Sequence, residues 1–288
     1  MDTKTLLFIG LGVVLVIYGA TIVRGGFARP TFPQTALGFV TAFFDTLGIG
    51  SFATTTTVFK LRNMVPVKLI PGTLNVGHTL PTIAQAFIYT SLVPVDAKTL
   101  VLMIAAACAG SWLGVGFVVQ WPRRRIQIGM GLALFGAAVV LLMQQLEWFP
   151  GGGETLGLSG PRLGVGLAGN FALGVLMMLG IGLYGPCMIL VSLLGMNPTA
   201  AFPIMMGSCA FLMPTSAVRF VKTRTYHVQA ALGLALGAVP AVLIAALLVK
   251  SLPIGVVRWL VIVVVVYTSI NMLATAGIAE GQDGHSHA

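Results

Sequence analysis

Nine long apolar runs divide this chain, and they constrain its fold more than any other feature of the sequence. A helix needs about 20 apolar residues to cross a bilayer, and most of the runs reach or approach that length. Charged residues make up only 8% of the 288 residues, against about 25% in a soluble domain. The composition therefore predicts an all-α polytopic membrane protein and excludes a soluble enzyme. The runs are 6–23, 35–59, 69–93, 99–120, 126–146, 163–194, 200–218, 228–249 and 256–278.

The formal net charge is +9, and the basic residues lie at the ends of the apolar runs. Such an excess would suggest nucleic-acid binding in a soluble protein, but charges that flank membrane spans are topology signals and contact anionic lipid. We therefore expect membrane lipid, and no nucleic acid, as a partner. Cys108, Cys187 and Cys209 lie inside apolar runs without the spacing of metal ligands, so we expect buried free thiols, no metal and no cofactor.

Residues 47–82 align without a gap with residues 179–214, which indicates an internal duplication. Both segments open with Leu-Gly-Ile-Gly and continue to a Pro-x-x-x-x-Pro spacing. A glycine inside a helix costs about 1 kcal/mol relative to alanine, so each Gly-x-Gly predicts a helix break. The identical pairs are Leu47/Leu179, Gly48/Gly180, Ile49/Ile181, Gly50/Gly182, Leu61/Leu193, Met64/Met196, Pro66/Pro198, Pro71/Pro203 and Leu80/Leu212.

Each broken segment is either a kinked span or a re-entrant hairpin, and the distribution of positive charge favours the hairpin. If residues 35–61 and 165–194 re-enter, eleven of the 16 Lys and Arg residues share one side of the membrane, an excess that nine plain spans do not produce. Each repeat then has one hairpin and three spanning helices, so two inverted repeats follow, as in many secondary transporters. Nine kinked spans are the alternative. The eleven are Arg24, Arg29, Lys60, Arg62, Lys68, Arg123, Arg124, Arg125, Arg219, Lys222 and Arg224.

The expected organisation has four parts. They are an extra N-terminal transmembrane helix in 1–30, repeat one in 31–150, repeat two in 151–278 and a short polar tail in 279–288. Asp2 offsets Lys4, so the first run lacks the basic start of a signal peptide and is expected to be retained. The charge distribution places the N-terminus outside and the C-terminus in the cytoplasm. The expected location is a bacterial inner membrane.

The repeats share a pattern of glycines, proline and small residues. Repeat two has Leu179-Gly180-Ile181-Gly182, Pro186, Leu194-Gly195-Met196-Asn197-Pro198 and Gly207-Ser208, and repeat one has Gly48-Ile49-Gly50-Ser51 and Gly72-Thr73-Leu74-Asn75. This pattern resembles the TauE/SafE sulfite exporter family, also called the toluene-sulfonate uptake permeases, over roughly residues 35–278. The resemblance implies transport of sulfite, thiosulfate or organosulfonates. Ser51 and Leu183 replace the third of the family's three consecutive glycines, so a divergent branch is expected.

The tips of the two hairpins are the candidate substrate site. Ser51 and Thr54–Thr57 begin the inner half of the first hairpin, where free backbone N–H groups and hydroxyls favour an oxyanion. The alternative is that these threonines bond back to backbone carbonyls. We expect a small anionic solute to bind between the tips. The expected ligands are Gly48, Gly50, Ser51, Thr54, Thr55, Asn75, Gly180, Gly182, Tyr184 and Ser208.

Two titratable residues near the first tip are candidates for proton coupling. Asp45 is the sole acid inside the apolar runs of the two repeats, and a charge at membrane depth is costly unless it is paired or protonated. His78 titrates near neutral pH and could exchange a proton with Asp45. The alternatives are a salt bridge or helix cap for Asp45 and a packing role for His78.

The chain lacks the motifs of an intramembrane or nucleotide-driven enzyme. It contains no Gly-x-Ser-x-Gly, no His-Glu-x-x-His, no Walker sequence and no second intramembrane acid beside Asp45. We therefore predict a secondary transporter of a small sulfur-containing anion rather than an enzyme. The alternatives are a carrier of another solute or of a metal ion, an intramembrane enzyme, and a scaffold without a substrate. Transport direction, proton coupling and homo-oligomerisation stay open.

Overall fold

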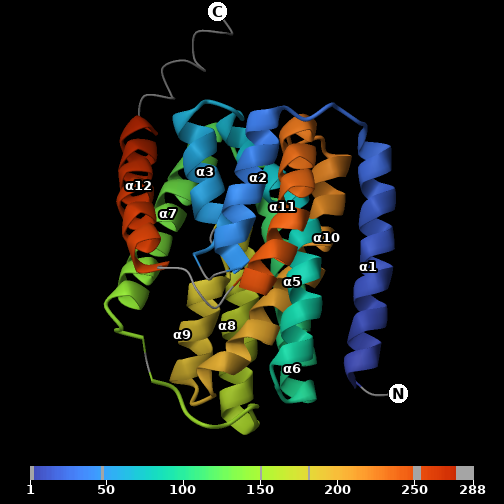
Figure 1. Cartoon of the computed structure of the whole chain (residues 1–288), viewed down its shortest axis with the longest axis vertical. Coiled ribbons are helices and arrows are strands. Elements are labelled where there is room, and N and C mark those ends of the chain that lie inside the picture. Colours follow the sequence, from blue (N-terminus) through green and yellow to red (C-terminus); the bar gives the residue numbers. More distant parts are fainter. Residues whose placement is uncertain (1–2, 47–48, 150, 181, 249–253, 277–288) are drawn as a thin grey trace, which may run out of the picture.

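The computed structural model describes residues 3–46, 49–149, 151–180, 182–248 and 254–276 (Figure 1). These residues are largely α-helical, and no β-strand occurs in these ranges. The helices are α1 (Thr3–Gly25), α2 (Phe32–Thr46), α3 (Ser51–Leu61), η1 (Val67–Leu69), α4 (Ile70–Gly77), α5 (Thr79–Leu92), α6 (Ala97–Val118), α7 (Arg123–Gln145), α8 (Gly160–Met177), α9 (Tyr184–Leu193), η2 (Pro198–Ala200), α10 (Ala201–Lys222), α11 (Val228–Leu248) and α12 (Ile254–Thr275).

Five helical segments are long and apolar enough to cross a bilayer, in agreement with the predicted all-α membrane class. Large apolar side chains on their outer surfaces are exposed, as they are on helices that face lipid; Val16 and Leu247 are 71% and 85% exposed. The expectation of seven spanning helices stays a prediction. The five segments are Thr5–Gly25, Ala97–Val118, Arg123–Gln145, Pro198–Lys222 and Val228–Leu247.

The chain breaks its helices at both predicted Gly-x-Gly sites. Helix α2 ends at Thr46 and α3 begins at Ser51, and Gly50 between them has a φ of 84°. Helix α8 ends at Met177 and α9 begins at Tyr184, after Gly180 with a φ of 95°. Positive φ is a conformation that glycine adopts readily and other residues avoid. Each break thus separates two helices, α2 from α3 and α8 from α9. Figure 1 shows α2 and α3 in the upper half of the molecule and α8 and α9 in the lower half.

The first helix of each pair packs closely against a helix from the other half of the chain, α2 against α11 and α8 against α6. Both partners carry a Gly-x-x-x-Gly motif, Gly233–Gly237 in α11 and Gly110–Gly114 in α6. Small residues let two helix backbones approach closely in a membrane. A methyl group at Gly237 would overlap the carbonyl oxygen of Thr35 in α2, and one at Gly110 would overlap that of Phe171 in α8.

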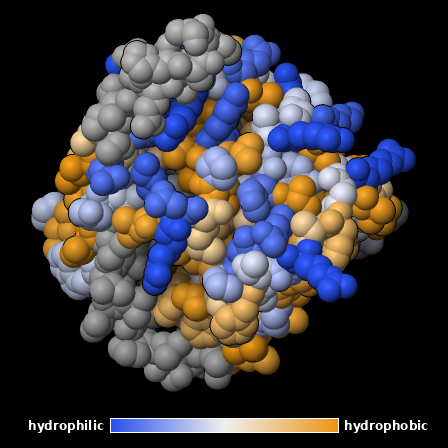
Figure 2. Space-filling model, turned by 90° about the horizontal axis from the view of Figure 1, so that it is seen from above, coloured by the Kyte–Doolittle hydropathy of each residue, from blue (hydrophilic) through white to orange (hydrophobic). Residues whose placement is uncertain are grey.

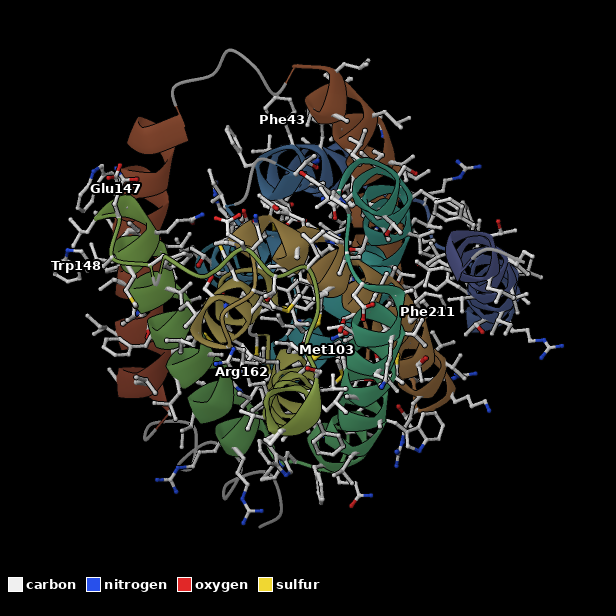
Figure 3. All side chains as sticks on the ribbon, turned by 90° about the horizontal axis from the view of Figure 1, so that it is seen from below. Phe43, Met103, Glu147, Trp148, Arg162 and Phe211 are labelled. Atoms are coloured by element: carbon white, nitrogen blue, oxygen red, sulfur yellow. The ribbon has the colours of Figure 1, made fainter. Side chains whose placement is uncertain are left out.

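Helix α1 lies at the outside of the bundle. It packs on α10 and α5, and Figure 3 shows Phe211 of α10 between α1 and the other helices. The Phe211 ring lies against Gly10 of α1. The Tyr18 hydroxyl donates a 2.6 Å hydrogen bond to the carbonyl of Val76 in α4. This buried bond ties the peripheral helix to the centre of the molecule.

Many of the basic residues in the described part of the chain lie at one end of the bundle. The last residues of α1, α3 and α10 and the first residues of α2, α7 and α11 lie together at the upper end of Figure 1, and Figure 2 shows hydrophilic side chains among apolar ones at that end. The basic residues of these termini include Arg24, Lys60, the run Arg123–Arg125 and Lys222. Figure 3 shows the opposite end, where Glu147, Trp148 and Arg162 lie.

At that opposite end, Asp96 caps α6. Its carboxylate accepts hydrogen bonds of 2.8 Å from both the backbone N–H and the hydroxyl of Thr99. The hydrogen bonds from Thr99 hold the pKa of Asp96 below its usual value. The Thr99 hydroxyl also accepts a hydrogen bond of 2.9 Å from the N–H of Leu158, so the cap anchors the segment that leads into α8.

Candidate functional site

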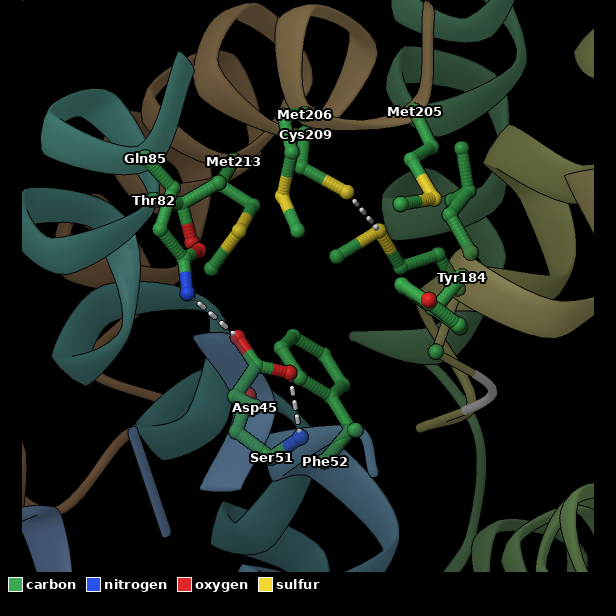
Figure 4. A pocket seen from close by; sticks show the side chains of 14 residues that line it. Asp45, Ser51, Phe52, Thr82, Gln85, Tyr184, Met205, Met206, Cys209 and Met213 are labelled. Carbon is green, nitrogen blue, oxygen red and sulfur yellow. Dashed lines mark hydrogen bonds between the residues drawn. The ribbon is translucent and has the colours of Figure 1, made fainter. Parts of the chain in front are cut away.

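The two helix breaks meet at a shared cavity of about 40 Å³, which we call the tip cavity. Gly50 belongs to the first break and Gly182 to the second, and both line it. A second cavity of about 40 Å³ adjoins it and shares Gly50, Phe52, Gly182 and Tyr184. Figure 4 shows the side chains around the opening. The lining residues of the tip cavity are Asp45, Gly50, Ser51, Phe52, Thr82, Gln85, Met177, Gly182, Leu183, Tyr184, Met205, Met206, Cys209 and Met213.

Asp45 lies at the wall of the tip cavity and holds the start of α3. Its Oδ1 accepts a 2.6 Å hydrogen bond from the backbone N–H of Ser51, the first residue of α3. Its Oδ2 accepts a 3.0 Å hydrogen bond from Nε2 of Gln85 in α5 (Figure 4). A carboxylate at a helix N-terminus interacts favourably with the helix dipole. Asp45 therefore occupies the position at α3 where the sequence predicted a substrate anion.

Polar side chains of α5 support the carboxylate. Gln85 Nε2 also donates to the hydroxyl of Thr46 at 3.0 Å, and the Tyr89 hydroxyl donates to the carbonyl of Thr46 at 2.8 Å. The bond from Tyr89 satisfies the Thr46 carbonyl, at the end of α2 where carbonyls have no helical partner. The network holds the end of α2 against α5, and Gln85 joins the Ser51 N–H as the second neutral donor to Asp45.

Five of the residues predicted for the site line the tip cavity, namely Asp45, Gly50, Ser51, Gly182 and Tyr184. Six others lie elsewhere in the structure: Thr54, Thr55, Asn75, His78, Gly180 and Ser208. Gly48 lies outside the described residues. Thr54 and Thr55 lie on the same face of α3 as Ser51, at i+3 and i+4, but their hydroxyls bond within the protein.

Two of the threonines of α3, Thr54 and Thr55, make hydrogen bonds within the protein, whereas the buried hydroxyls of Thr56 and Thr57 have no hydrogen-bond partner among the described residues. The Thr54 hydroxyl bonds back to the carbonyls of Gly50 and Ser51, at 3.1 and 3.0 Å. The Thr55 hydroxyl lies 3.1 Å from Nε2 of the buried His78, whose ring packs on Phe52 at a centroid distance of 5.8 Å. The His78 ring thus pairs with Thr55, whereas the Asp45 carboxylate bonds to Ser51 and Gln85.

The remaining polar residues connect helices behind the cavity. The Ser216 hydroxyl donates to Oδ1 of Asn75 at 3.2 Å, which joins α10 to α4. Nδ2 of Asn170 in α8 donates to the Ser208 hydroxyl at 3.0 Å and to the carbonyl of Met103 at 2.7 Å. These residues are buried, so their bonds stabilise the bundle rather than reach a solute in the cavity.

Sequence reasoning missed most of the side chains opposite Asp45. Met205, Met206, Cys209 and Met213 share one face of α10, and Met177 joins them from the end of α8. The signal was present as a Met-Met-x-x-Cys-x-x-x-Met spacing, which places these residues near one another on a helix. Thr82 and Gln85 of α5 were also missed, since nothing in their spacing separates them from packing residues.

Within the described part of the chain, no group of three or more His, Cys, Asp or Glu side chains is placed to hold a metal ion. Comparisons of the chain with protein-family models, with curated proteins and with solved structures find no match.

Proposed function

We propose that this protein is a secondary transporter that moves a small sulfur-containing anion, such as sulfite, thiosulfate or an organosulfonate. The observation that carries the proposal is that both helix breaks open on one shared cavity. Irregular backbone at membrane depth is tolerated where it is buried in protein or lines a cavity, and broken helices of transporters form their substrate sites in this way. The anion class rests on the resemblance to the TauE/SafE family.

An inverted-repeat architecture belongs to this proposal, and two observations support it. Helix boundaries recur between the aligned segments: α3 begins at Ser51 and α9 at Tyr184, and the short helices η1 and η2 follow at matching places. The first helix of repeat one, α2, packs against α11 of repeat two, and the first helix of repeat two, α8, packs against α6 of repeat one. Such an exchange is the packing expected around a pseudo-twofold axis.

Asp45 gives the proposed transport cycle its coupling step. An ionised carboxylate in the tip cavity repels a second anion, and the repulsion is strong where little water screens it. The substrate therefore binds when Asp45 carries a proton. Protonation also weakens the hold of Asp45 on Ser51, which frees the start of α3 for the substrate. The anion and the proton consequently travel together.

The same proposal places the protein in a bacterial inner membrane with its basic end in the cytoplasm. Arg24 at the end of α1 belongs to that end, which puts the N-terminus outside. Joint movement of substrate and proton across this membrane needs no nucleotide, so the proposed driving force is an ion gradient or the gradient of the substrate itself.

Proteoliposomes containing the purified protein test the proposal. Saturable flux of sulfite, thiosulfate or an organosulfonate is expected, with a rate that rises as the pH falls. Asp45→Asn should retain flux but lose its pH dependence, because the amide mimics the protonated acid. Glu154→Gln, which neutralises an exposed acid in the loop before α8, is the matched control and should behave as wild type. Absence of flux for all three anions, or chemical conversion of the compound, would refute the transporter.

A further inference from the structure

The wall of the tip cavity opposite Asp45 is rich in sulfur. Four of its residues come from α10 and one from α8, and Figure 4 shows sulfur atoms directed into the same opening. Methionine often fills irregular gaps in a core, but here the thioethers line an open space next to a carboxylate. The sulfur residues are Met177, Met205, Met206, Cys209 and Met213.

The distance between two of these sulfurs suits a shared ion. Sγ of Cys209 and Sδ of Met177 lie 3.8 Å apart, and both residues are buried. With a bond of about 2.3 Å, the zinc–sulfur value, two sulfurs on one ion are separated by about 3.8 Å in tetrahedral and about 4.0 Å in trigonal geometry, and a larger ion such as Ag(I) separates them further. The pair therefore needs little movement to bind one ion from two different helices.

We infer that the tip cavity binds a soft monovalent cation, Cu(I) or Ag(I), through Cys209, Met177 and at least one further methionine of α10. Thiolate and thioether ligands select soft ions, whereas hard ions such as Mg²⁺ and Ca²⁺ prefer oxygen. The Cys209 thiol releases its proton to water when the sulfur binds the ion. The Asp45 carboxylate on the facing wall adds negative charge that favours a cation.

This inference goes beyond the proposed transport of an anion, and the two can fail separately. Ion binding is measured on the purified protein without any anion, and anion flux is measured without any metal. A shared cavity makes the two ligands mutually exclusive. Ag(I) is therefore also expected to inhibit anion flux in a protein that carries Cys209.

Ag(I) binding to the full-length protein in detergent tests the inference. Cys108 and Cys187 do not line the tip cavity, so a Cys108→Ser, Cys187→Ser background leaves Cys209 as its single thiol. Calorimetric titration should give one Ag(I) per chain. In this background, Met177→Leu should weaken binding by at least about tenfold, since even the loss of an outer partner of a metal site costs about 10- to 100-fold. Leucine preserves the volume of the side chain, so the fold should persist.

Met188→Leu is the matched control, because Met188 lies on α9 outside the tip cavity. It should leave Ag(I) affinity unchanged, and Cys209→Ser should abolish the tight site. Equal Ag(I) affinity in the Met177→Leu and Met188→Leu variants would overturn the inference, because Cys209 would then bind silver as an isolated thiol. Absence of a stoichiometric site in the single-thiol background would overturn it as well.

Discussion

At the residue scale, two hydroxyl residues of α3 differ in what they contact, one facing the tip cavity and the other a buried histidine. Ser51 lines the cavity, whereas Thr55 is held by His78. Loss of a hydrogen bond to a charged ligand costs about 1.5–3 kcal/mol, or about 10- to 100-fold in affinity. Ser51→Ala should therefore raise the half-saturation concentration by about that factor, while thermal stability changes little.

Thr55→Val provides the matched comparison for Ser51→Ala. It leaves the buried His78 ring nitrogen without its partner, which should cost about 1–3 kcal/mol of stability, while the half-saturation concentration stays near the wild-type value. Flux assays and thermal unfolding of both variants in the same detergent check the pair. If Thr55→Val weakened substrate affinity as much as Ser51→Ala, the substrate would lie on the His78 side of α3.

At the scale of elements, two glycine contacts set the distance between the halves of the molecule. A methyl group at Gly237 would overlap the Thr35 carbonyl, and backbone atoms cannot move aside as a flexible side chain can. Overpacking of this kind costs about 1–3 kcal/mol, so Gly237→Ala and Gly110→Ala should each lower the temperature of unfolding.

Gly136→Ala on α7 is the control, because nothing lies within 4 Å of the added methyl group. It should leave the unfolding temperature unchanged or raise it, since alanine is the better helix former by about 1 kcal/mol. Equal unfolding temperatures for Gly237→Ala and Gly136→Ala would mean that α2 and α11 are not in close contact. The thermal unfolding of all three variants is measured in the same detergent.

At the scale of the whole molecule, the paired half-helices determine which loops share a side of the membrane. Arg62 follows α3 and Arg123 begins α7, and both belong to the basic end. In a cysteine-free background, Arg62→Cys and Arg123→Cys should react with a membrane-impermeant maleimide from the same side. Glu154→Cys should react from the other side. Labelling of the Arg62 and Arg123 positions from opposite sides would favour nine plain spans over the hairpins.

The sequence by itself determined the membrane class and the positions of the breaks. Scarce charge and long apolar runs leave no other class of fold, and paired glycines are poor enough helix formers to end α2 and α8 near Asp45 and Leu179. Only the tertiary structure decided which side chains face the cavity. In water, the polar face of a helix reveals its orientation, but lipid-facing and buried surfaces of a membrane helix are both apolar.

The rotation of each helix was therefore set by close packing at small residues, which the apolar pattern does not record. This is why Ser51 and Met213 line the tip cavity. The polar side chains of His78 and Ser208 bond to neighbouring helices instead. The position of Asp45 near the tip was readable from the chain. Its hydrogen bond with Gln85, a residue far along the sequence, depended on how α5 packs against the end of α2.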